Sequence, residues 1–141
     1  GLDINGKRIT LASFRGKNVL LVFYLSDQCV HCMEQLGAIS NRHSEFENLN
    51  TVILAVSATT PKANKDSLKL GAFNAVLVSD VDHQNARRFA SYDDFEEMEL
   101  HSTILIDAQG RVRWKRSGGE PFGDVDYLLA EIKRWNPWRT E

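Results

Sequence analysis

Residues 18–32 read NVLLVFYLSDQCVHC and combine an apolar run, a short polar break and a pair of cysteines. The run from Asn18 to Leu25 is almost entirely apolar, which is typical of a central strand buried on both faces. Ser26, Asp27 and Gln28 end the run, and a helix is predicted to begin at about Cys29. The order of strand, turn and helix therefore places the first cysteine at a helix N-terminus.

The motif Cys29-Val30-His31-Cys32 contains both cysteines of the chain. Residues three apart lie one turn from each other on the same face of a helix, with Cα atoms about 5–6 Å apart, which a disulfide accepts. Such a disulfide closes a very small loop and restrains little of the unfolded chain. We therefore expect the pair to be oxidised and reduced rather than to hold the fold together.

The start of a helix stabilises a thiolate, because it carries partial positive charge and unpaired backbone N–H groups. We expect Cys29 to be the exposed nucleophile and Cys32 to be the resolving thiol. The Cys29 thiolate would attack a disulfide to form a mixed disulfide, and Cys32 would then displace the product. The imidazolium of His31 would favour the thiolate further; alternatively, His31 is an exposed helical residue without a role.

The rest of the chain alternates between predicted strands and helices. A short extended piece is expected at Arg8–Leu11, and further strands are expected at Thr51–Ser57, Ala75–Ser79, Thr103–Asp107 and Arg111–Arg116. Helices are expected from Cys29 towards Leu49, from Pro61 to Gly71, over Asp80–Ser91 and over Asp124–Trp135. A turn at Ala108–Gly110 would join the last two strands, and Asp93–Glu99 would be a solvated loop or helix edge. This order predicts a three-layer α/β sandwich with a mixed sheet.

The composition fits one globular domain over residues 1–141. The chain has 43% hydrophobic and 26% charged residues, and its formal net charge is −2. These values are ordinary for a globular protein with a real core. The basic residues are scattered, so we expect no nucleic-acid partner. The chain begins with Gly1 rather than Met, as a processed protein or a domain from a longer chain would, and no compartment is predicted.

Two segments carry a family resemblance. Residues 5–32 contain Asn5-Gly6-Lys7, Phe14-Arg15-Gly16-Lys17, the apolar strand and the CxxC motif, and residues 102–112 read STILIDAQGRV. Together they resemble the redoxin family of the thioredoxin-fold superfamily, which includes AhpC/TSA-type peroxiredoxins and TlpA/ResA-like thiol–disulfide oxidoreductases. The resemblance implies a thioredoxin-like three-layer α/β/α sandwich with a central mixed β-sheet. It also implies an enzyme that works through thiol chemistry, for which no cofactor is expected.

Some positions depart from the family pattern. Aligned on Cys29, Val22 stands where peroxiredoxins carry a proline that shields the thiolate, and Ser26 stands where they carry a threonine. Thioredoxin-like proteins usually place a cis-proline just before the strand that begins here at Thr103. His101 occupies that place, and peroxiredoxins commonly have an arginine near it. The resemblance implies that His101 supplies a cationic or hydrogen-bonding group; alternatively, it is a loop residue.

The sequence identifies the residue that accepts a proton from the dithiol less clearly than it identifies the cysteines. Thioredoxins have a buried aspartate on the strand before the dithiol, and the matching residue here is Phe23. Glu34 follows Cys32 closely and is a candidate general base, although a helical glutamate usually lies on a solvated face. Ser102, beside His101, is expected to line the site.

Three functions remain open at this point. The first is a thiol–disulfide oxidoreductase that uses Cys29 and Cys32. The second is a thiol-dependent peroxidase in which Cys29 forms a sulfenic acid that Cys32 resolves, favoured by the long region Ser57–Ser91, which resembles peroxiredoxins. The third is a non-catalytic thioredoxin-fold interaction domain. The expected partners are a protein or small-molecule disulfide or a peroxide, together with an external thiol reductant or oxidant.

No metal site is predicted. A structural zinc site needs about four ligands, and the chain has one CxxC pair and no second pair. His31 would project away from the cysteines along the helix. The other histidines are dispersed along the sequence, at His43, His83 and His101.

Overall fold

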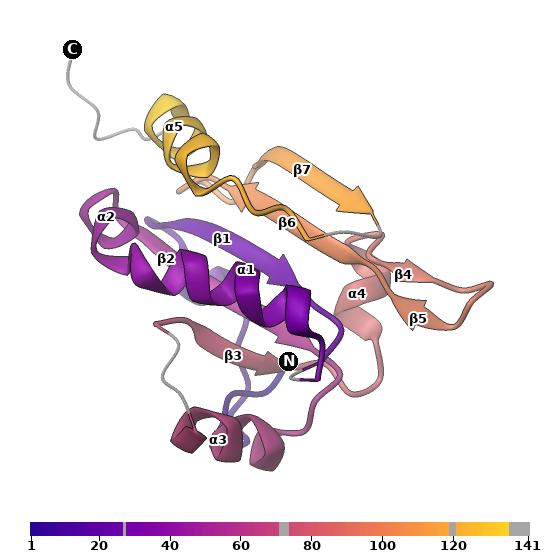
Figure 1. Cartoon of the computed structure of the whole chain (residues 1–141). Coiled ribbons are helices and arrows are strands. Elements are labelled where there is room, and N and C mark those ends of the chain that lie inside the picture. Colours follow the sequence, from indigo (N-terminus) through magenta and orange to yellow (C-terminus); the bar gives the residue numbers. More distant parts are fainter. Residues whose placement is uncertain (27, 71–73, 119–120, 136–141) are drawn as a thin grey trace.

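The centre of the computed structural model, which describes residues 1–26, 28–70, 74–118 and 121–135, is a mixed five-stranded sheet. Its strands lie in the order β3-β2-β1-β6-β7 (Figure 1). Their bounds are β1 Asn18–Phe23, β2 Thr51–Ser57, β3 Val76–Ser79, β6 His101–Ile106 and β7 Val112–Gly118. β1, β2 and β3 are parallel, whereas β6 is antiparallel to both β1 and β7. The mixed sheet predicted from the sequence is therefore confirmed.

Helices cover both faces of the sheet, which gives the predicted three layers. Figure 1 shows α1 and α5 lying along one face. The elements packed on that face are α1 (Val30–Asn41), α2 (His43–Asn48) and α5 (Val125–Trp135). The opposite face packs against α4 (Gln84–Arg88) and the 3-10 turn η1 (Leu11–Phe14), while α3 (Pro61–Leu70) lies beside β3. None of the helices described is long and apolar enough to cross a bilayer.

β1 supplies side chains to both layers. All six of its residues are buried, as the unbroken apolar run predicted. Leu20 and Val22 belong to the core cluster under α1, whereas Leu21 and Phe23 belong to the cluster under α4. This alternation follows from strand geometry, in which successive side chains point to opposite faces.

The helix predicted from Cys29 towards Leu49 is in fact two helices. α1 ends at Asn41 and α2 begins at His43, with Arg42 between them in a non-helical conformation. The guanidinium of Arg42 pairs with Glu45 and with Asp126 of α5. Arg42, which separates α1 from α2, is therefore linked by ion pairs to α2 and to α5.

Asp80 explains why the helix predicted over Asp80–Ser91 is shorter than expected. Its buried carboxylate accepts hydrogen bonds from the backbone N–H groups of Asn85 and Ala86. These bonds give partners to backbone N–H groups of the first turn of α4 that have none within the helix. The residues between Asp80 and α4 therefore form a turn and do not continue the helix towards Asp80. The extended piece predicted at Arg8–Leu11 is also reduced, to an isolated bridge between Leu2 and Arg8.

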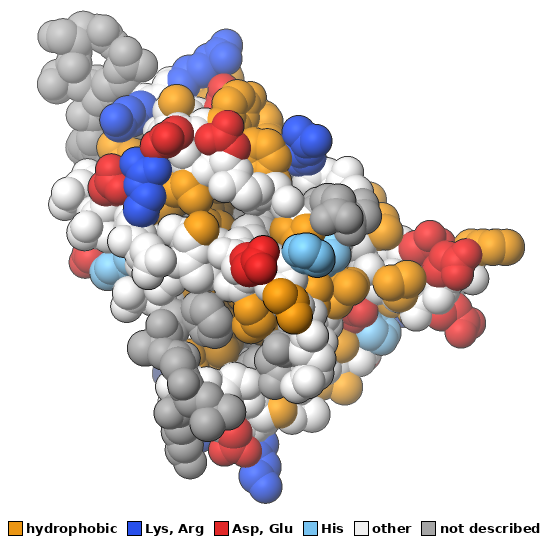
Figure 2. Space-filling view, in the orientation of Figure 1, with side chains coloured by type: hydrophobic (Ala, Val, Ile, Leu, Met, Phe, Trp, Pro, Cys, Tyr) orange, Lys and Arg blue, Asp and Glu red, His pale blue; other side chains and the backbone are white. Residues whose placement is uncertain are grey.

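The acidic segment predicted as a loop is a small hairpin. β4 (Tyr92–Asp93) pairs with β5 (Met98–Glu99). The Asp93 carboxylate accepts the N–H groups of Phe95 and Glu96 and so shapes the turn. Figure 2 shows acidic side chains gathered at the tip of this hairpin, at the right of the view.

Asp107 holds the turn between β6 and β7. Its buried carboxylate accepts the N–H groups of Gln109 and Arg111 and forms an ion pair with Arg113, with Nε and Oδ2 2.6 Å apart. Burial alone would raise the pKa of Asp107, but the hydrogen bonds from Arg111 and Arg113 outweigh this effect and hold the pKa below its usual value. The ionised carboxylate therefore stabilises the hairpin.

We expect Asp107→Asn to lower the free energy of unfolding at neutral pH by about 2 kcal/mol, because the charge-assisted hydrogen bonds are lost. The pKa of Asp107 is lower in the folded than in the unfolded chain. Its contribution is therefore complete above about pH 4 and is lost as the pH falls through the folded-state pKa. Urea denaturation of both proteins at neutral and at acidic pH measures this difference.

The difference between the two proteins should shrink at acidic pH, and a difference that stays constant would contradict the assignment. Asp94→Asn is the matched control. It removes a carboxylate whose side chain is 77% exposed and paired with Arg87. Its effect should stay below about 1 kcal/mol, as for other surface ion pairs.

Candidate thiol redox site

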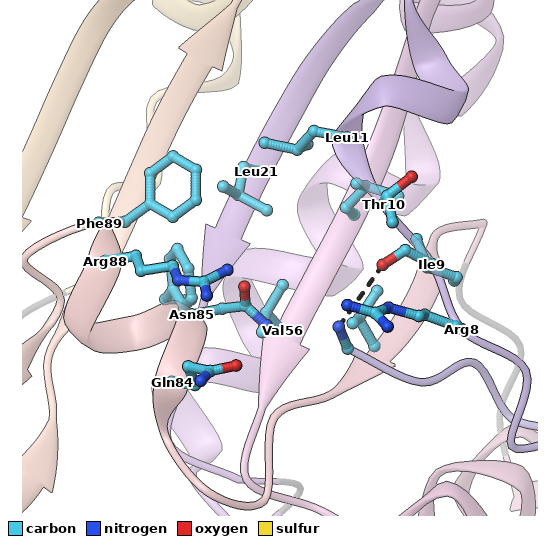
Figure 3. Close-up of a pocket in the computed structure, with 14 residues that line it drawn as sticks. Arg8, Ile9, Thr10, Leu11, Leu21, Val56, Gln84, Asn85, Arg88 and Phe89 are labelled. Atoms are coloured by element: carbon cyan, nitrogen blue, oxygen red, sulfur yellow. Dashed lines mark hydrogen bonds between the residues drawn. The ribbon is translucent and has the colours of Figure 1, made fainter.

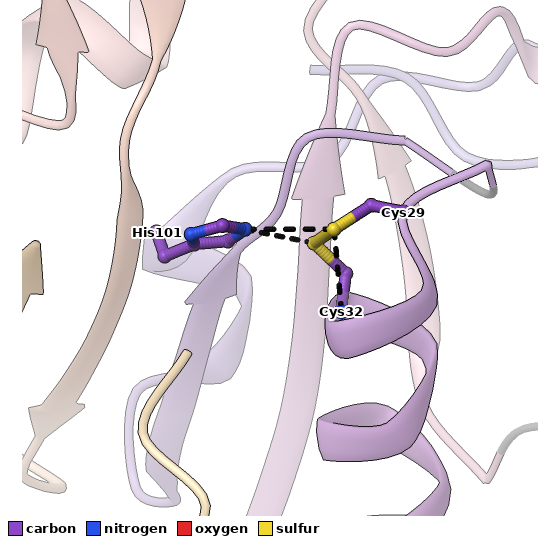
Figure 4. A group of neighbouring side chains, drawn as sticks. All are labelled: Cys29, Cys32 and His101. Carbon is purple, nitrogen blue, oxygen red and sulfur yellow. Dashed lines mark hydrogen bonds between the residues drawn. A yellow bond between two sulfur atoms is a disulfide. The ribbon is translucent and has the colours of Figure 1, made fainter. Parts of the chain in front are cut away.

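The two cysteines lie at the N-terminus of α1 and form a disulfide (Figure 4). Their Cα atoms are 5.2 Å apart, within the range that the CxxC spacing predicted. Cys29 is the N-cap residue, and its Sγ accepts the N–H of Cys32 with N and Sγ 3.3 Å apart. Cys29 is partly buried, whereas Cys32 has no exposed surface. The two sulfurs are therefore unequally accessible.

Ser26 shapes the turn that leads from β1 to the disulfide. Its hydroxyl accepts the N–H of Gln28, and its carbonyl accepts the N–H of Cys29, both at 3.2 Å. These bonds bring Cys29 directly to the start of α1. Val22, at the spacing of the peroxiredoxin proline, is fully buried inside β1 and pairs with Thr103 of β6.

His101 lies against both sulfurs. It is the first residue of β6 and is only 8% exposed. Its Nε2 atom is 2.9 Å from Sγ of Cys32 and 3.7 Å from Sγ of Cys29. β6 pairs with β1 so that Ser102 stands opposite Phe23, and His101 thereby reaches the end of β1 where the turn to α1 begins. The fold thus brings together residues that are 72 positions apart in the sequence.

His31 and Glu34 lie on the exposed side of α1. Each side chain is 70% exposed, and they face each other with Nδ1 and Oε2 3.7 Å apart. Cys32, between them in the sequence, faces the core instead. The tuning role predicted for His31 and the general-base role considered for Glu34 receive no support from this placement.

Ser102 points away from the disulfide, which corrects the expectation that it lines the site. Its hydroxyl is 2.7 Å from Ser91 Oγ and 2.8 Å from Ser117 Oγ. Successive side chains of a strand alternate between faces, so Ser102 lies on the opposite face from His101. The Ser102 hydroxyl therefore forms hydrogen bonds with Ser91 and Ser117 and takes no part in the thiol chemistry.

Gln35 is a buried polar residue to which the sequence assigned no role. It is 4% exposed, and its Nε2 group donates to Thr103 Oγ1 at 2.9 Å and to the Phe122 carbonyl at 2.8 Å. One amide thus ties α1 to β6 and to the segment before α5. Its place beside Leu36 on an otherwise apolar helix face was the signal that could have identified it.

A separate cavity lies away from the disulfide. It has a volume of about 400 Å³ and lies on the α4 face of the sheet, where Leu21 and Val56 line it (Figure 3). The guanidinium groups of Arg8 and Arg88 point into it. Neither cysteine lines this cavity, so it is separate from the thiol site.

A CxxC disulfide at a helix start, beside a mixed sheet, defines a thiol redox domain of the thioredoxin type. The model of the AhpC/TSA family matches residues 1–115, and the chain belongs to this family. The family predicted from the two resembling segments is thereby confirmed.

Individual relatives agree with the family. The chain is 32% identical over 114 residues to the chloroplastic 2-Cys peroxiredoxin BAS1 of Spinacia oleracea, covering 75% of this chain and 43% of that protein. It is 29% identical over 143 residues to the mitochondrial thioredoxin-dependent peroxide reductase of Mus musculus, covering 92% of this chain and 54% of that protein. The chain thus spans about half the length of the curated relatives it matches.

The fold agrees as well. Peroxiredoxin Q of Xanthomonas campestris superposes with a TM-score of 0.85 at 24% identity, covering 94% of this chain and 88% of that chain. At this identity the likeness shows the fold alone. The thioredoxin-like α/β/α sandwich predicted from the resemblance is confirmed.

Because Gln35 ties α1 to β6, we expect Gln35→Leu to lower the free energy of unfolding by about 1–3 kcal/mol, with the Phe122 carbonyl left without its donor. The variant should also shift His101 relative to the sulfurs. Urea denaturation measures the first effect, and the NMR chemical shifts of the His101 imidazole measure the second. Gln84→Leu, at an exposed position of α4, is the control. Unchanged imidazole shifts in Gln35→Leu would contradict the positioning role.

Proposed function

We propose that this domain is a thiol–disulfide oxidoreductase that cycles Cys29 and Cys32 between dithiol and disulfide. The observation that carries the proposal is the unequal burial of two bonded sulfurs. Cys29 is partly exposed at the start of α1, whereas Cys32 is fully buried behind it. A visiting disulfide can therefore approach Cys29, while Cys32 is placed to react with Cys29.

Cys29 would make the first attack in the reduced protein. The N-terminus of α1 and the N–H of Cys32 both favour negative charge on its sulfur. The thiolate attacks one sulfur of the substrate disulfide, and the other substrate sulfur leaves as a thiolate. The product of this step is a mixed disulfide between Cys29 and the substrate.

Cys32 would complete the cycle with the help of His101. The Cys32 thiol must lose its proton before it can attack the Cys29 sulfur, and Nε2 of His101 is 2.9 Å away, within reach of that proton. The Cys32 thiolate then displaces the remaining substrate thiolate and forms the internal disulfide. Two electrons have then passed to the substrate, and an external thiol reductant would restore the dithiol.

His101 would replace the acidic proton acceptor of thioredoxins. Phe23, at the matching position of β1, belongs to the core cluster under α4 and so faces away from the disulfide. The imidazole is itself almost fully buried, and it contacts both reacting sulfurs. These two features support a direct role for His101 in the proton transfer.

Peroxide reduction is the second candidate, because the chain belongs to a family that includes peroxiredoxins. The Cys29 thiolate would attack the O–O bond and release an alcohol or water, and Cys32 would attack the resulting sulfenic acid and release water. One feature supports disulfide exchange instead: Val22 is buried inside β1 where the shielding proline would stand.

The two candidates differ in their oxidising substrate. We expect the reduced protein to catalyse the reduction of insulin disulfides by dithiothreitol, and Cys29→Ser to abolish this activity, because the nucleophile is lost. We expect hydrogen peroxide to be consumed no faster by the wild-type protein than by Cys29→Ser. Turbidity of the released insulin B chain and loss of peroxide are the two measurements. Rapid peroxide consumption that depends on Cys29, without insulin reduction, would overturn the proposal in favour of a peroxidase.

His101→Ala should slow the second step of the cycle by about 10²-fold, because general base catalysis typically contributes 10²–10⁴-fold. The mixed disulfide between Cys29 and thionitrobenzoate should therefore persist, and rapid mixing followed by mass spectrometry measures its lifetime. Cys32→Ser lacks the thiol that resolves the mixed disulfide, so it gives the longest lifetime expected. His31→Ala, which removes an exposed histidine from the same motif, should leave the lifetime unchanged. A wild-type lifetime in His101→Ala would show that His101 is not the proton acceptor.

A further inference from the structure

Three soft or borderline donor atoms converge at the start of α1. They are the Sγ atoms of Cys29 and Cys32 and Nε2 of His101, and all three lie within 4.8 Å of one another (Figure 4). The sulfurs come from one helical turn, and the imidazole comes from the first residue of β6. The sequence predicted no metal site because its histidines are dispersed, but folding brings one of them to the dithiol.

We propose that the reduced dithiol and His101 together bind one Cu(I) ion. Metal–sulfur bonds of about 2.3 Å and metal–nitrogen bonds of about 2.0–2.1 Å place two donors of one ion roughly 3.5–4 Å apart. The distance from Nε2 to Sγ of Cys29, 3.7 Å, lies within that range, whereas the distance to Sγ of Cys32, 2.9 Å, would have to lengthen by about 0.6 Å. Reduction breaks the bond between the sulfurs, so these can also move apart while α1 stays in place.

The identity and number of the donors favour Cu(I) over Zn(II). Thiolates are soft ligands that select Cu(I) as well as zinc, and imidazole suits both ions. A structural zinc ion takes four ligands, whereas the cluster found among the residues with described positions offers three. Zn(II) would need water in its fourth position, and Cys32 and His101 are only 0% and 8% exposed. A three-coordinate ion needs no fourth ligand, and of the three donor residues only Cys29 is open to solvent.

The charge balance supports the same assignment. Both sulfurs bind Cu(I) as thiolates, so binding releases to solvent any proton that either sulfur still carries. Two thiolates and one Cu(I) ion carry a net charge of −1. The N-terminus of α1 and the N–H of Cys32 both stabilise negative charge at that point.

Binding would depend on the oxidation state of the cysteines. The disulfide offers no thiolate, so the oxidised protein would hold no copper, and oxidation of the dithiol would release the ion. This activity goes beyond the proposed disulfide exchange, which needs no metal. Copper itself keeps its oxidation state throughout, so the two electrons that the cysteines lose when the disulfide forms pass to the disulfide or peroxide that Cys29 attacks.

The experiment is a competition for Cu(I) under oxygen-free conditions, with bathocuproine disulfonate as the coloured probe. The reduced protein should withdraw one Cu(I) ion per chain from the probe, and the disulfide form should withdraw none. X-ray absorption should report two sulfur ligands and one nitrogen ligand. A copper site with sulfur ligands only would overturn the proposed donor set. The same competition with Zn(II) and a zinc indicator should show weaker binding, and tighter Zn(II) binding would overturn the choice of ion.

Variants of His101 test whether this residue binds the copper ion or only packs beside the cysteines. His101→Ala should lower the Cu(I) affinity by more than about tenfold, since loss of even a second-shell partner costs roughly 10–100-fold. His101→Met keeps a side chain of similar size with a soft thioether and should restore Cu(I) binding but not Zn(II) binding. His31→Ala is the control and should bind as the wild type does. Cu(I) affinity that is unchanged in His101→Ala, with the protein folded by circular dichroism, would overturn the proposal.

These outcomes are distinct from those that test disulfide exchange. A protein that binds Cu(I) through all three ligands but does not reduce insulin would contradict the proposed function and leave the copper site standing. A protein that reduces insulin but leaves Cu(I) with the probe would contradict the copper site and leave the proposed function standing.

Discussion

The antiparallel pairing of β6 with β1 is the constraint on which the thiol site depends. Both strands are buried along their whole length, and their register places Ser102 opposite Phe23. That register brings His101 to the end of β1, from which the turn leads to Cys29. A slip of one residue would move every side chain of β6 to the other face and turn His101 away from the sulfurs. The apolar pattern that forms the core therefore also fixes the distance between the imidazole and the disulfide.

Two kinds of contact hold α1 on the sheet. One fixes the rotation of the helix about its axis, and the other fixes its position along β6. The apolar residues Leu36 and Ile39 bury the same helix face as Cys32 and so fix how the helix is rotated on the sheet. Gln35 adds directional hydrogen bonds to Thr103 and to the Phe122 carbonyl, which limit sliding along β6. Apolar packing tolerates small shifts, whereas hydrogen bonds of this geometry do not. Cys29 lies at the edge of these contacts and keeps access to solvent.

The sequence predicted those parts of the molecule that depend on local pattern. β1, the CxxC motif at a helix start and α5 follow from apolar runs, spacing and polar breaks, and all three are present. The contact between His101 and the sulfurs could only be anticipated from the family resemblance, because it joins residues distant in the sequence. The sequence pattern predicts a strand that begins at Thr103 and leaves Ser102 beside the site; the strand in fact begins at His101, which puts His101 and Ser102 on opposite faces. The sequence pattern does not mark Gln35, because a polar residue in a helix usually faces solvent, and only the packed structure shows that it is buried.

A histidine at this place changes what the site can do. Peroxiredoxins commonly carry an arginine near this point, and a guanidinium can donate hydrogen bonds but can neither take a proton from a thiol nor bind a metal ion. The Nε2 atom of an imidazole can do either, depending on the state of the sulfurs that face it. While Cys29 is held in a mixed disulfide, the proton of the free Cys32 thiol is the proposed partner of Nε2; when both cysteines are thiolates, a soft cation is the proposed partner of all three donors. In the proposed scheme, a histidine at this place connects proton transfer and Cu(I) binding to one dithiol, and the disulfide excludes both.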